Sequence, residues 1–396
     1  MIAPCPSGEG HETRLRGWLE AIPTPAYVAD IAKIKRNLAT AARIKRETGC
    51  RILLATKAFA MPVLFPLMRE TLDGTTSSGL FEARMEREEF DKEIHTYIPA
   101  YKEEEFAQIV ELADCVYFNS ASQVERYIDR VKAKGKRAGL RINPGFSNST
   151  VGGDLYNPCA PCSRFGELPA QFHRIPWDKI DILHVHTLCD SLHDGSVKLI
   201  QHVAENFAEQ VGKVKAVNFG GGHYFNHPDY DVDAFIAAIR NFRAIFPHVE
   251  IYFEPGGALV YDAGYLVATV LDFHFNAKPL AILDTSANNH MPIVLQAHYR
   301  QPLQGAGKPG EFPHTYVLGG NMCMTGDVIG EYSFPKPLKV GDRLVFEDMI
   351  QYSFVQNNTF NGVPLPDLFV LHEDGTVQRA SAFGYEDFRS RLGFPA

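Results

Sequence analysis

Residues 51–60 read Arg51-Ile-Leu-Leu-Ala-Thr-Lys57-Ala-Phe-Ala60, a short apolar run that ends in a lysine. A run of this length predicts a buried strand, and the strand carries the lysine at its carboxyl end. Burial disfavours the charged form of an amine and lowers its pKa, so a buried lysine can act as a nucleophile. A lysine that points from the strand end into solvent is the simpler alternative.

Seven more apolar runs follow and alternate with stretches of helical spacing. The eight predicted strands are Arg51–Ala55, Gly74–Ser77, Thr96–Pro99, Cys115–Phe118, Arg137–Ile142, Ile180–Val185, Ala216–Phe219 and Glu250–Phe253. The predicted helices between them cover residues 80–90, 102–112, 121–134, 196–211 and 232–246. This alternation is typical of a (β/α)8 TIM-like barrel, which needs about 250 residues. We therefore expect an α/β fold with the barrel over residues 24–262, entered by the extended segment Thr24–Asp30 and the helix Ile31–Thr48.

From Gly264 onward the pattern becomes rich in β-strands and turns. The predicted strands here cover residues 265–272, 280–285, 315–318, 343–346 and 368–371. We expect residues 263–396, together with residues 1–23, to form a second, mostly-β domain.

Composition and charge exclude several classes of protein. The 396 residues carry a formal net charge of −8 without a long basic run, which disfavours nucleic acid and anionic membranes as partners. No apolar run reaches 18 residues, and the first residues lack the pattern of a secretion signal. Seven scattered cysteines indicate reduced thiols. We expect a cytoplasmic protein.

Polar and glycine residues gather at the predicted strand ends, where a barrel enzyme has its chemistry. The triplet Gly220-Gly221-Gly222 can bring backbone N–H groups against a phosphate, although a tight turn explains it equally well. Glu254 is a carboxylate among apolar residues and needs a partner, either an arginine or the protonated ring nitrogen of a cofactor. A strand-end lysine, a phosphate-binding turn and such a carboxylate are together what a pyridoxal 5'-phosphate site requires.

With these residues the sequence resembles the fold type III pyridoxal phosphate decarboxylases, and most closely the carboxynorspermidine/carboxyspermidine decarboxylases of polyamine biosynthesis. The resemblance covers residues 24–388. It implies that Lys57, in Ala55-Thr-Lys57-Ala, forms the Schiff base with the cofactor, and that His186, in His184-Val-His186-Thr-Leu-Cys-Asp190, stacks on its ring. It also implies that Gly220–Gly222 bind the phosphate, that Glu254 faces the ring nitrogen, and that Gly256 and Gly257 contact the cofactor. We expect His184 to be a satisfied core histidine.

The resemblance continues through the β-rich domain. In Leu318-Gly-Gly-Asn-Met-Cys323-Met-Thr-Gly-Asp327 it implies that Cys323 returns a proton after CO2 is lost and that Asp327 contacts the substrate amine. It implies a contact of Tyr352 with the cofactor phosphate and of His290 with the substrate. Because the family inserts the Cys323 segment into the active site of the partner subunit, the resemblance implies a homodimer with shared sites and a small amino acid substrate.

Two positions depart from the family pattern and leave the substrate open. The chain has Ile293 where the family usually has an aspartate, and Met324 lies in a further changed segment. Loss of an acidic residue at position 293 removes a partner for a distal ammonium group. The alternatives are a decarboxylase of diaminopimelate, ornithine, arginine or an aminocarboxypropyl conjugate, and a pyridoxal phosphate-binding regulator without catalysis.

Other polar and aromatic clusters have simpler interpretations. Cys159 and Cys162 have half the spacing of a zinc site, but without a second such pair we expect a packed loop and no metal. The aromatic residues at positions 97, 101, 117 and 118 are predicted to be core or loop packing.

Overall fold

The structure is a computed structural model, and it describes residues 17–148, 156–296 and 299–393. Within these ranges the chain divides into two compact units. Residues 37–259 form one unit, and residues 17–36 with residues 260–393 form the other. The predicted place of residues 1–16 and 394–396 in the second domain lies outside the described residues.

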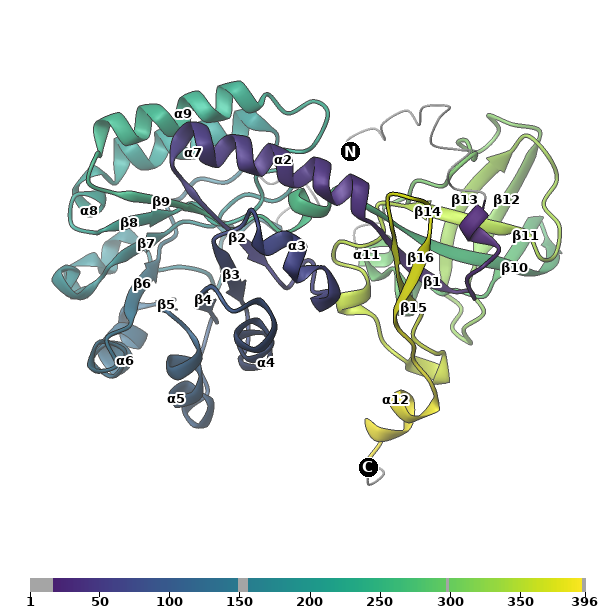
Figure 1. The fold of residues 1–396 in the computed structure, drawn as a ribbon, viewed down its shortest axis with the longest axis horizontal. Helices are drawn as coiled ribbons and strands as arrows, with labels where there is room; N and C mark the ends of the chain where they lie inside the picture. The colour runs from purple at the N-terminus through teal and green to yellow at the C-terminus, as the bar shows by residue number, and fades with distance from the viewer. Residues whose placement is uncertain (1–16, 149–155, 297–298, 394–396) are drawn as a thin grey trace. The chain divides into compact units, whose positions relative to one another are not determined.

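The first unit is a closed barrel of eight parallel strands in sequence order, which confirms the predicted fold class (Figure 1). Its strands are β2 (Arg51–Ala55), β3 (Gly74–Ser77), β4 (Glu93–Tyr97), β5 (Cys115–Phe118), β6 (Arg137–Arg141), β7 (Ile182–His184), β8 (Ala216–Asn218) and β9 (Glu250–Phe253). The last strand pairs with the first, because Arg51 lies opposite Tyr252 and Ile52 opposite Phe253. The carboxyl ends of all eight strands therefore meet at one mouth.

Helices lie outside this ring of strands (Figure 1). They are α3 (Phe65–Arg69), α4 (Leu80–Met85), α5 (Glu103–Leu112), α6 (Ala121–Ala133), α7 (His193–Asn206), α8 (Ala208–Val211) and α9 (Val232–Ile245), and α2 (Ile31–Thr48) precedes them in the chain. Side-chain caps begin two of them, since Ser120 accepts from the N–H of Gln123 and Asp231 from that of Ala234. The predicted helix over residues 80–90 is α4 followed by a π-helical turn.

The second unit contains one mixed sheet in the order β13-β12-β11-β10-β1-β15-β16, with β14 paired to β10. The strands are β1 (Ala26–Asp30), β10 (Gly264–Asn276), β11 (Lys278–Leu283), β12 (His314–Gly319), β13 (Val328–Phe334), β14 (Arg343–Glu347), β15 (Asp367–Leu371) and β16 (Val377–Ser381). Three short helices complete it, α10 (Ala287–His290), α11 (Pro292–Gln296) and α12 (Tyr385–Ser390). In the described ranges no helix has the length and apolar character needed to cross a membrane.

Two boundaries differ from the sequence prediction. We expected Thr24–Asp30 to enter the barrel domain, but β1 pairs antiparallel with β10 and parallel with β15 in the mixed sheet. Its fully buried residues suit either sheet, and only long-range pairing decides between them. The predicted strand at residues 96–99 is β4 over Glu93–Tyr97, because two polar residues, Glu93 and His95, interrupt its apolar pattern.

Candidate active site

Lys57 lies two residues beyond β2, at the mouth of the barrel. The strand end is held by its neighbours, since Ala55 donates to the carbonyl of Pro255 and Thr56 to that of Thr76. We expected a buried lysine, but the residue is exposed between two buried neighbours, Thr56 and Ala58. The surrounding protein still removes part of its hydration, and this effect, with the positive charge of Arg141, lowers the pKa of Lys57. No described carboxylate forms an ion pair with it, so the amine is available as a nucleophile.

Glu254 follows β9 directly and points a buried carboxylate into the same mouth, with only 4% of the residue exposed. Its Oε1 accepts a hydrogen bond of 2.7 Å from Asn218 Nδ2. Burial alone would raise its pKa, but His184, His95 and Asn218 oppose this and lower the pKa of Glu254 to about 2. The carboxylate is therefore ionised at neutral pH and can hold a protonated ring nitrogen.

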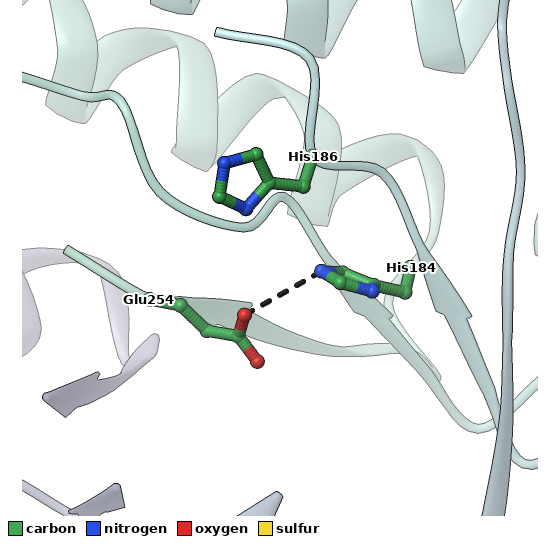
Figure 2. A group of neighbouring side chains, drawn as sticks. All are labelled: His184, His186 and Glu254. Atoms are coloured by element: carbon green, nitrogen blue, oxygen red, sulfur yellow. Dashed lines mark ion pairs between the residues drawn. The ribbon is translucent and has the colours of Figure 1, made fainter. Parts of the chain in front are cut away.

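Two histidines of β7 and its following loop lie beside this carboxylate (Figure 2). His184 Nε2 is 3.5 Å from Glu254 Oε2, yet neither ring nitrogen makes a hydrogen bond within the described chain. His184 is thus a core histidine, as predicted, but in the described chain its ring nitrogens lack the hydrogen-bond partners that we expected. Burial and the charges of Lys57 and Arg141 lower the pKa of His186 well below its usual value, so this ring is neutral. A neutral, flat imidazole fits the predicted role of stacking on an aromatic cofactor.

His184, His186 and Glu254 are also the one cluster in the described chain whose donor atoms could hold a metal, since these atoms lie within 4.8 Å of one another. Cys159 and Cys162, for which zinc was the less favoured alternative, belong to no such cluster among the described residues. Cys159 Sγ instead donates to the carbonyl of Phe146 at 3.3 Å, which fits a packed loop.

The glycine turn after β8 brings backbone into contact with the site. Gly220 and Gly222 have φ values of +67° and +86°, which side chains other than glycine rarely adopt. A Cβ on Gly221 would lie 2.6 Å from the carbonyl oxygen of Glu254, so no larger residue fits. The N–H of Gly222 has no acceptor within the described residues and can bind an anion. The turn is therefore both tight and open to a phosphate.

Arg141 ends β6 and is a site residue that the sequence analysis missed. It is 6% exposed, donates to the carbonyl of His186 at 2.8 Å, and stacks its guanidinium over the rings of Tyr97 and Phe165. Burial lowers its pKa, and none of the described carboxylates pairs with it. A buried cation without a carboxylate partner fits a mouth that receives an anionic ligand. The sequence signal that could have identified Arg141 as a site residue was its position at the end of a predicted strand.

Asn218, Tyr117 and His95 were missed as well. Asn218 ends β8 and bonds to Glu254, while Tyr117, predicted to be packing, bonds to Asn218 and to His95 at 2.7 Å each. A polar residue at a strand end was again the only sequence signal for Asn218.

In the second unit, Cys323 and Asp327 belong to the loop between β12 and β13. Cys323 is exposed and Asp327 is 5% exposed. Asp327 Oδ1 accepts from the hydroxyl of Ser286 at 2.9 Å and from the N–H of Asn288 at 3.2 Å. Its Oδ2 is buried without a partner in the described chain. An unpartnered buried carboxylate oxygen suits a cationic group of a substrate.

Tyr352 and His290 have different surroundings in the same unit. Tyr352 has a φ of +47°, an uncommon conformation for a bulky residue that is often found at functional sites. The ring of His290 is buried and uses both nitrogens, one with Thr285 Oγ1 at 2.9 Å and one with the carbonyl of Pro364 at 3.1 Å. A substrate contact by the His290 ring would have to replace one of these bonds.

The residues of the barrel mouth fit pyridoxal phosphate. Lys57 offers the amine, Glu254 the negative charge for the ring nitrogen, His186 a flat neutral ring, and Gly221–Gly222 a turn that no Cβ fills. The unpaired guanidinium of Arg141 adds the positive charge that an anionic cofactor needs.

A barrel with this mouth, joined to a β unit, defines a pyridoxal phosphate-dependent decarboxylase of the barrel-and-sheet class. The family described as pyridoxal-dependent decarboxylase, C-terminal sheet domain, matches residues 26–350. The chain is 39% identical over 385 residues to the carboxynorspermidine/carboxyspermidine decarboxylase of Campylobacter jejuni, which covers 94% of this chain and 99% of that protein. It is equally identical over 376 residues to the carboxyaminopropylagmatine decarboxylase of Synechocystis, covering 95% and 97%.

A solved structure agrees with these relatives. The carboxynorspermidine decarboxylase of Campylobacter jejuni in complex with norspermidine superposes with a TM-score of 0.87 at 37% identity, covering 93% of this chain and all of that one. The chain belongs to the carboxynorspermidine/carboxyspermidine decarboxylase family. It is a pyridoxal phosphate-dependent carboxy-lyase, as the sequence predicted.

Proposed function

We propose that this enzyme removes the α-carboxylate of carboxynorspermidine or carboxyspermidine in polyamine biosynthesis. The observation that carries the proposal is the buried Oδ2 of Asp327, which lacks a partner among the described residues. These substrates are polycations, and a carboxylate held by Ser286 and Asn288 offers a fixed acceptor for one of their ammonium groups. The names of the Campylobacter jejuni relative and of the norspermidine complex support the same substrate class.

The residues of the barrel mouth have different proposed roles in the reaction. Pyridoxal phosphate, when bound, supplies the electron sink for the bond between Cα and the carboxylate. Lys57 would hold the cofactor through its amine, whose lowered pKa favours the nucleophilic form. Glu254 keeps its negative charge toward the ring nitrogen, because its pKa is lowered to about 2. His186, whose pKa is also lowered, contributes a flat neutral surface.

Cys323 completes the proposal. Its exposed thiol would return a proton to Cα after CO2 leaves, with Asp327 four residues on to orient the amine. We include a homodimer in which this loop enters the site of the second copy, with Tyr352 on the cofactor phosphate. The strained φ of Tyr352 supports a functional role for that residue. A cytoplasmic location is supported by the six described cysteines, which are all free.

A second candidate is decarboxylation of carboxyaminopropylagmatine. It is favoured by the Synechocystis relative, whose 39% identity equals that of the Campylobacter jejuni protein. The substrate ends in a guanidinium, whereas the carboxypolyamines end in an ammonium group. Ile293, which is partly buried in α11, offers no carboxylate to a terminal ammonium. This is the aminocarboxypropyl conjugate that the sequence analysis left open.

The test is CO2 release from purified, cofactor-loaded enzyme. The panel contains carboxynorspermidine, carboxyspermidine, carboxyaminopropylagmatine, meso-diaminopimelate, ornithine and arginine, with Lys57→Ala as the blank. We expect the highest kcat/KM on a carboxypolyamine. A higher value on carboxyaminopropylagmatine would replace the first candidate by the second, and release from diaminopimelate or ornithine alone would refute both.

A further inference from the structure

The interior of the barrel holds a continuous chain of polar side chains that starts at Glu254. Asn218 Nδ2 lies 2.7 Å from Glu254 Oε1 and 2.7 Å from the hydroxyl of Tyr117. The same hydroxyl lies 2.7 Å from His95 Nδ1, and His95 Nε2 lies 2.8 Å from Glu93 Oε1. Tyr117, His95 and Asn218 are each less than 1% exposed, so water does not compete for these bonds.

The polar chain ends at Glu93, whose negative charge is neutralised at the end of the barrel opposite the mouth. Glu93 is the first residue of β4, and its Oε2 accepts from Arg51 Nη1 at 2.8 Å. Its Oε1 also accepts from the hydroxyl of Tyr252 at 3.1 Å. The chain therefore runs the length of the barrel, from the charged residues at the amino ends of the strands to the carboxylate at the mouth.

The donors and acceptors along the chain are matched. Because the N–H of Gly220 donates to Asn218 Oδ1 at 2.9 Å, the NH2 group of this amide must face Glu254 and Tyr117. Tyr117 then accepts from Asn218 and donates to His95 Nδ1, and His95 Nε2–H donates to Glu93. An amide does not relay protons in this way, so the chain fixes orientation and charge and does not deliver a proton.

Asn218 joins two parts of the cofactor site. Its NH2 group holds the carboxylate of Glu254, which would face the ring nitrogen of the cofactor, and its carbonyl oxygen holds the first residue of the glycine turn. Rotation of this one amide would release both. The hydrogen bond from Asn218 to the hydroxyl of Tyr117 opposes such rotation, and the hydroxyl of Tyr117 is in turn held by His95.

We propose that Tyr117 and His95 are positioning residues for the decarboxylation, which act through Asn218 to hold Glu254 and the glycine turn in the geometry that pyridoxal phosphate requires. The inference rests on the cofactor and is independent of which amino acid is the substrate. Several titratable or charged groups face Glu254; they are Lys57 after β2, His95 on β4, Cys115 and Tyr117 on β5, Arg141 on β6, and His184 and His186 on and after β7.

The test compares variants that break the chain with a matched loss of a hydroxyl elsewhere in the barrel. Tyr117→Phe and His95→Leu break it, whereas His95→Gln keeps a donor and an acceptor. Tyr101→Phe is the control, since the hydroxyl of Tyr101 is buried and donates to the backbone carbonyl of Tyr117 at 2.7 Å but to none of the side chains of the polar chain.

All measurements use the full-length protein. The pyridoxal phosphate dissociation constant is measured by equilibrium dialysis of protein from which the cofactor has been removed. The pH dependence of the absorbance of bound cofactor, kcat and KM are measured as well. We expect Tyr117→Phe and His95→Leu to weaken cofactor binding about 10-fold and to move the absorbance transition. kcat should fall while KM stays within about 2-fold. His95→Gln should keep most of the affinity, and Tyr101→Phe should lower only the melting temperature.

The proposal is overturned if Tyr117→Phe and His95→Leu match Tyr101→Phe in cofactor affinity and absorbance. If Tyr117→Phe does not fold, the two His95 variants decide the question. Equal cofactor affinity in His95→Leu and His95→Gln would refute a role of the hydrogen bond between His95 and Tyr117. If the variants differ in cofactor affinity as expected but the wild-type enzyme does not decarboxylate the proposed substrates, only the proposed function is refuted.

Discussion

At the scale of single residues, the barrel mouth sets two pKa values in the direction that the chemistry needs. The pKa of Lys57 is lowered by the surrounding protein and by Arg141, which favours the nucleophilic amine. The pKa of Glu254 is lowered to about 2 although burial opposes this, because His184, His95 and Asn218 favour its charge. One mouth therefore holds an amine that loses its proton easily and a carboxylate that stays ionised.

Replacing Glu254 by glutamine tests the importance of that charge. Glu254→Gln keeps an oxygen that can accept from Asn218 but removes the negative charge beside the ring nitrogen. We expect kcat to fall by about 100-fold or more, measured as CO2 release at saturating cofactor. Glu250→Gln is the control, because this carboxylate begins the same strand and is 45% exposed at the other end of the barrel. Equal losses in both variants would contradict the assignment.

Asp327→Asn tests the proposed substrate contact. The amide keeps the bonds from Ser286 and Asn288 to one oxygen but presents an uncharged group in place of Oδ2. We expect KM for the carboxypolyamine to rise by about 10-fold with kcat nearly retained, since a hydrogen bond to a charged partner is lost. Steady-state kinetics measure this, and an unchanged KM would exclude Asp327 as the contact.

Residue patterns predicted Lys57 and Glu254 because each ends or follows an apolar strand. They did not distinguish Arg141 or Asn218 from ordinary strand-end polar residues, since their roles depend on contacts with His186 and Glu254 that are distant in sequence. For His290 the resemblance implied a substrate contact, but it did not show that both ring nitrogens are already bonded to Thr285 and to the carbonyl of Pro364.

At the scale of elements, the turn after β8 is the most constrained backbone of the site. Gly221→Ala would bring a Cβ within 2.6 Å of the carbonyl of Glu254, and one of the two backbones must move. We expect a loss of about 10-fold or more in pyridoxal phosphate affinity, measured by equilibrium dialysis. Gly212→Ala is the matched control, because Gly212 follows α8 with a φ of −65° and has room for a Cβ. Normal affinity in Gly221→Ala would show that the turn does not bind the phosphate.

Strand β4 shows why one element boundary was wrong. Its sequence Glu93-Ile-His95-Thr-Tyr places Glu93 and His95 on alternate positions where an apolar pattern is expected. Both belong to the polar chain inside the barrel. The alternation of a β-strand was present in the sequence, but its inward-facing positions are polar residues, so a search for alternating apolar residues missed it.

At the scale of the whole molecule, each unit contains a buried histidine whose pKa is lowered to about 4 by burial. His223 in the barrel bonds to Ser196 and to the carbonyl of Phe219, and His290 lies in the β unit. In the unfolded chain a histidine binds its proton near pH 6.5. The unfolded state therefore binds more protons between about pH 6.5 and about pH 4, and stability falls as the pH is lowered through this window.

We expect the free energy of unfolding to drop by about 3 kcal/mol per histidine over that window, measured by chemical denaturation at several pH values. His223→Gln and His290→Gln should each make the free energy of unfolding depend less on pH. A pH-independent free energy of unfolding in the wild type would contradict the burial of both rings in neutral form.

The proposed shared sites predict complementation between two inactive variants. Lys57→Ala and Cys323→Ala should each lack activity, and a dimer of one copy of each would contain one intact site. We expect mixing and subunit exchange to restore about a quarter of wild-type activity per protein, measured as CO2 release. Sites built within one copy would give no recovery.

The alternation of apolar runs with helical spacing determined the barrel from sequence alone, because strand and helix periods are local properties of the chain. Motifs of adjacent residues also predicted Lys57, Glu254 and the glycine turn as site residues, and their roles stay predictions. Only the tertiary structure decided that β1 joins the mixed sheet and that a polar chain crosses the barrel to Glu254. Both depend on pairing between residues far apart in the sequence, and no local pattern specifies which distant partner a side chain or strand will meet.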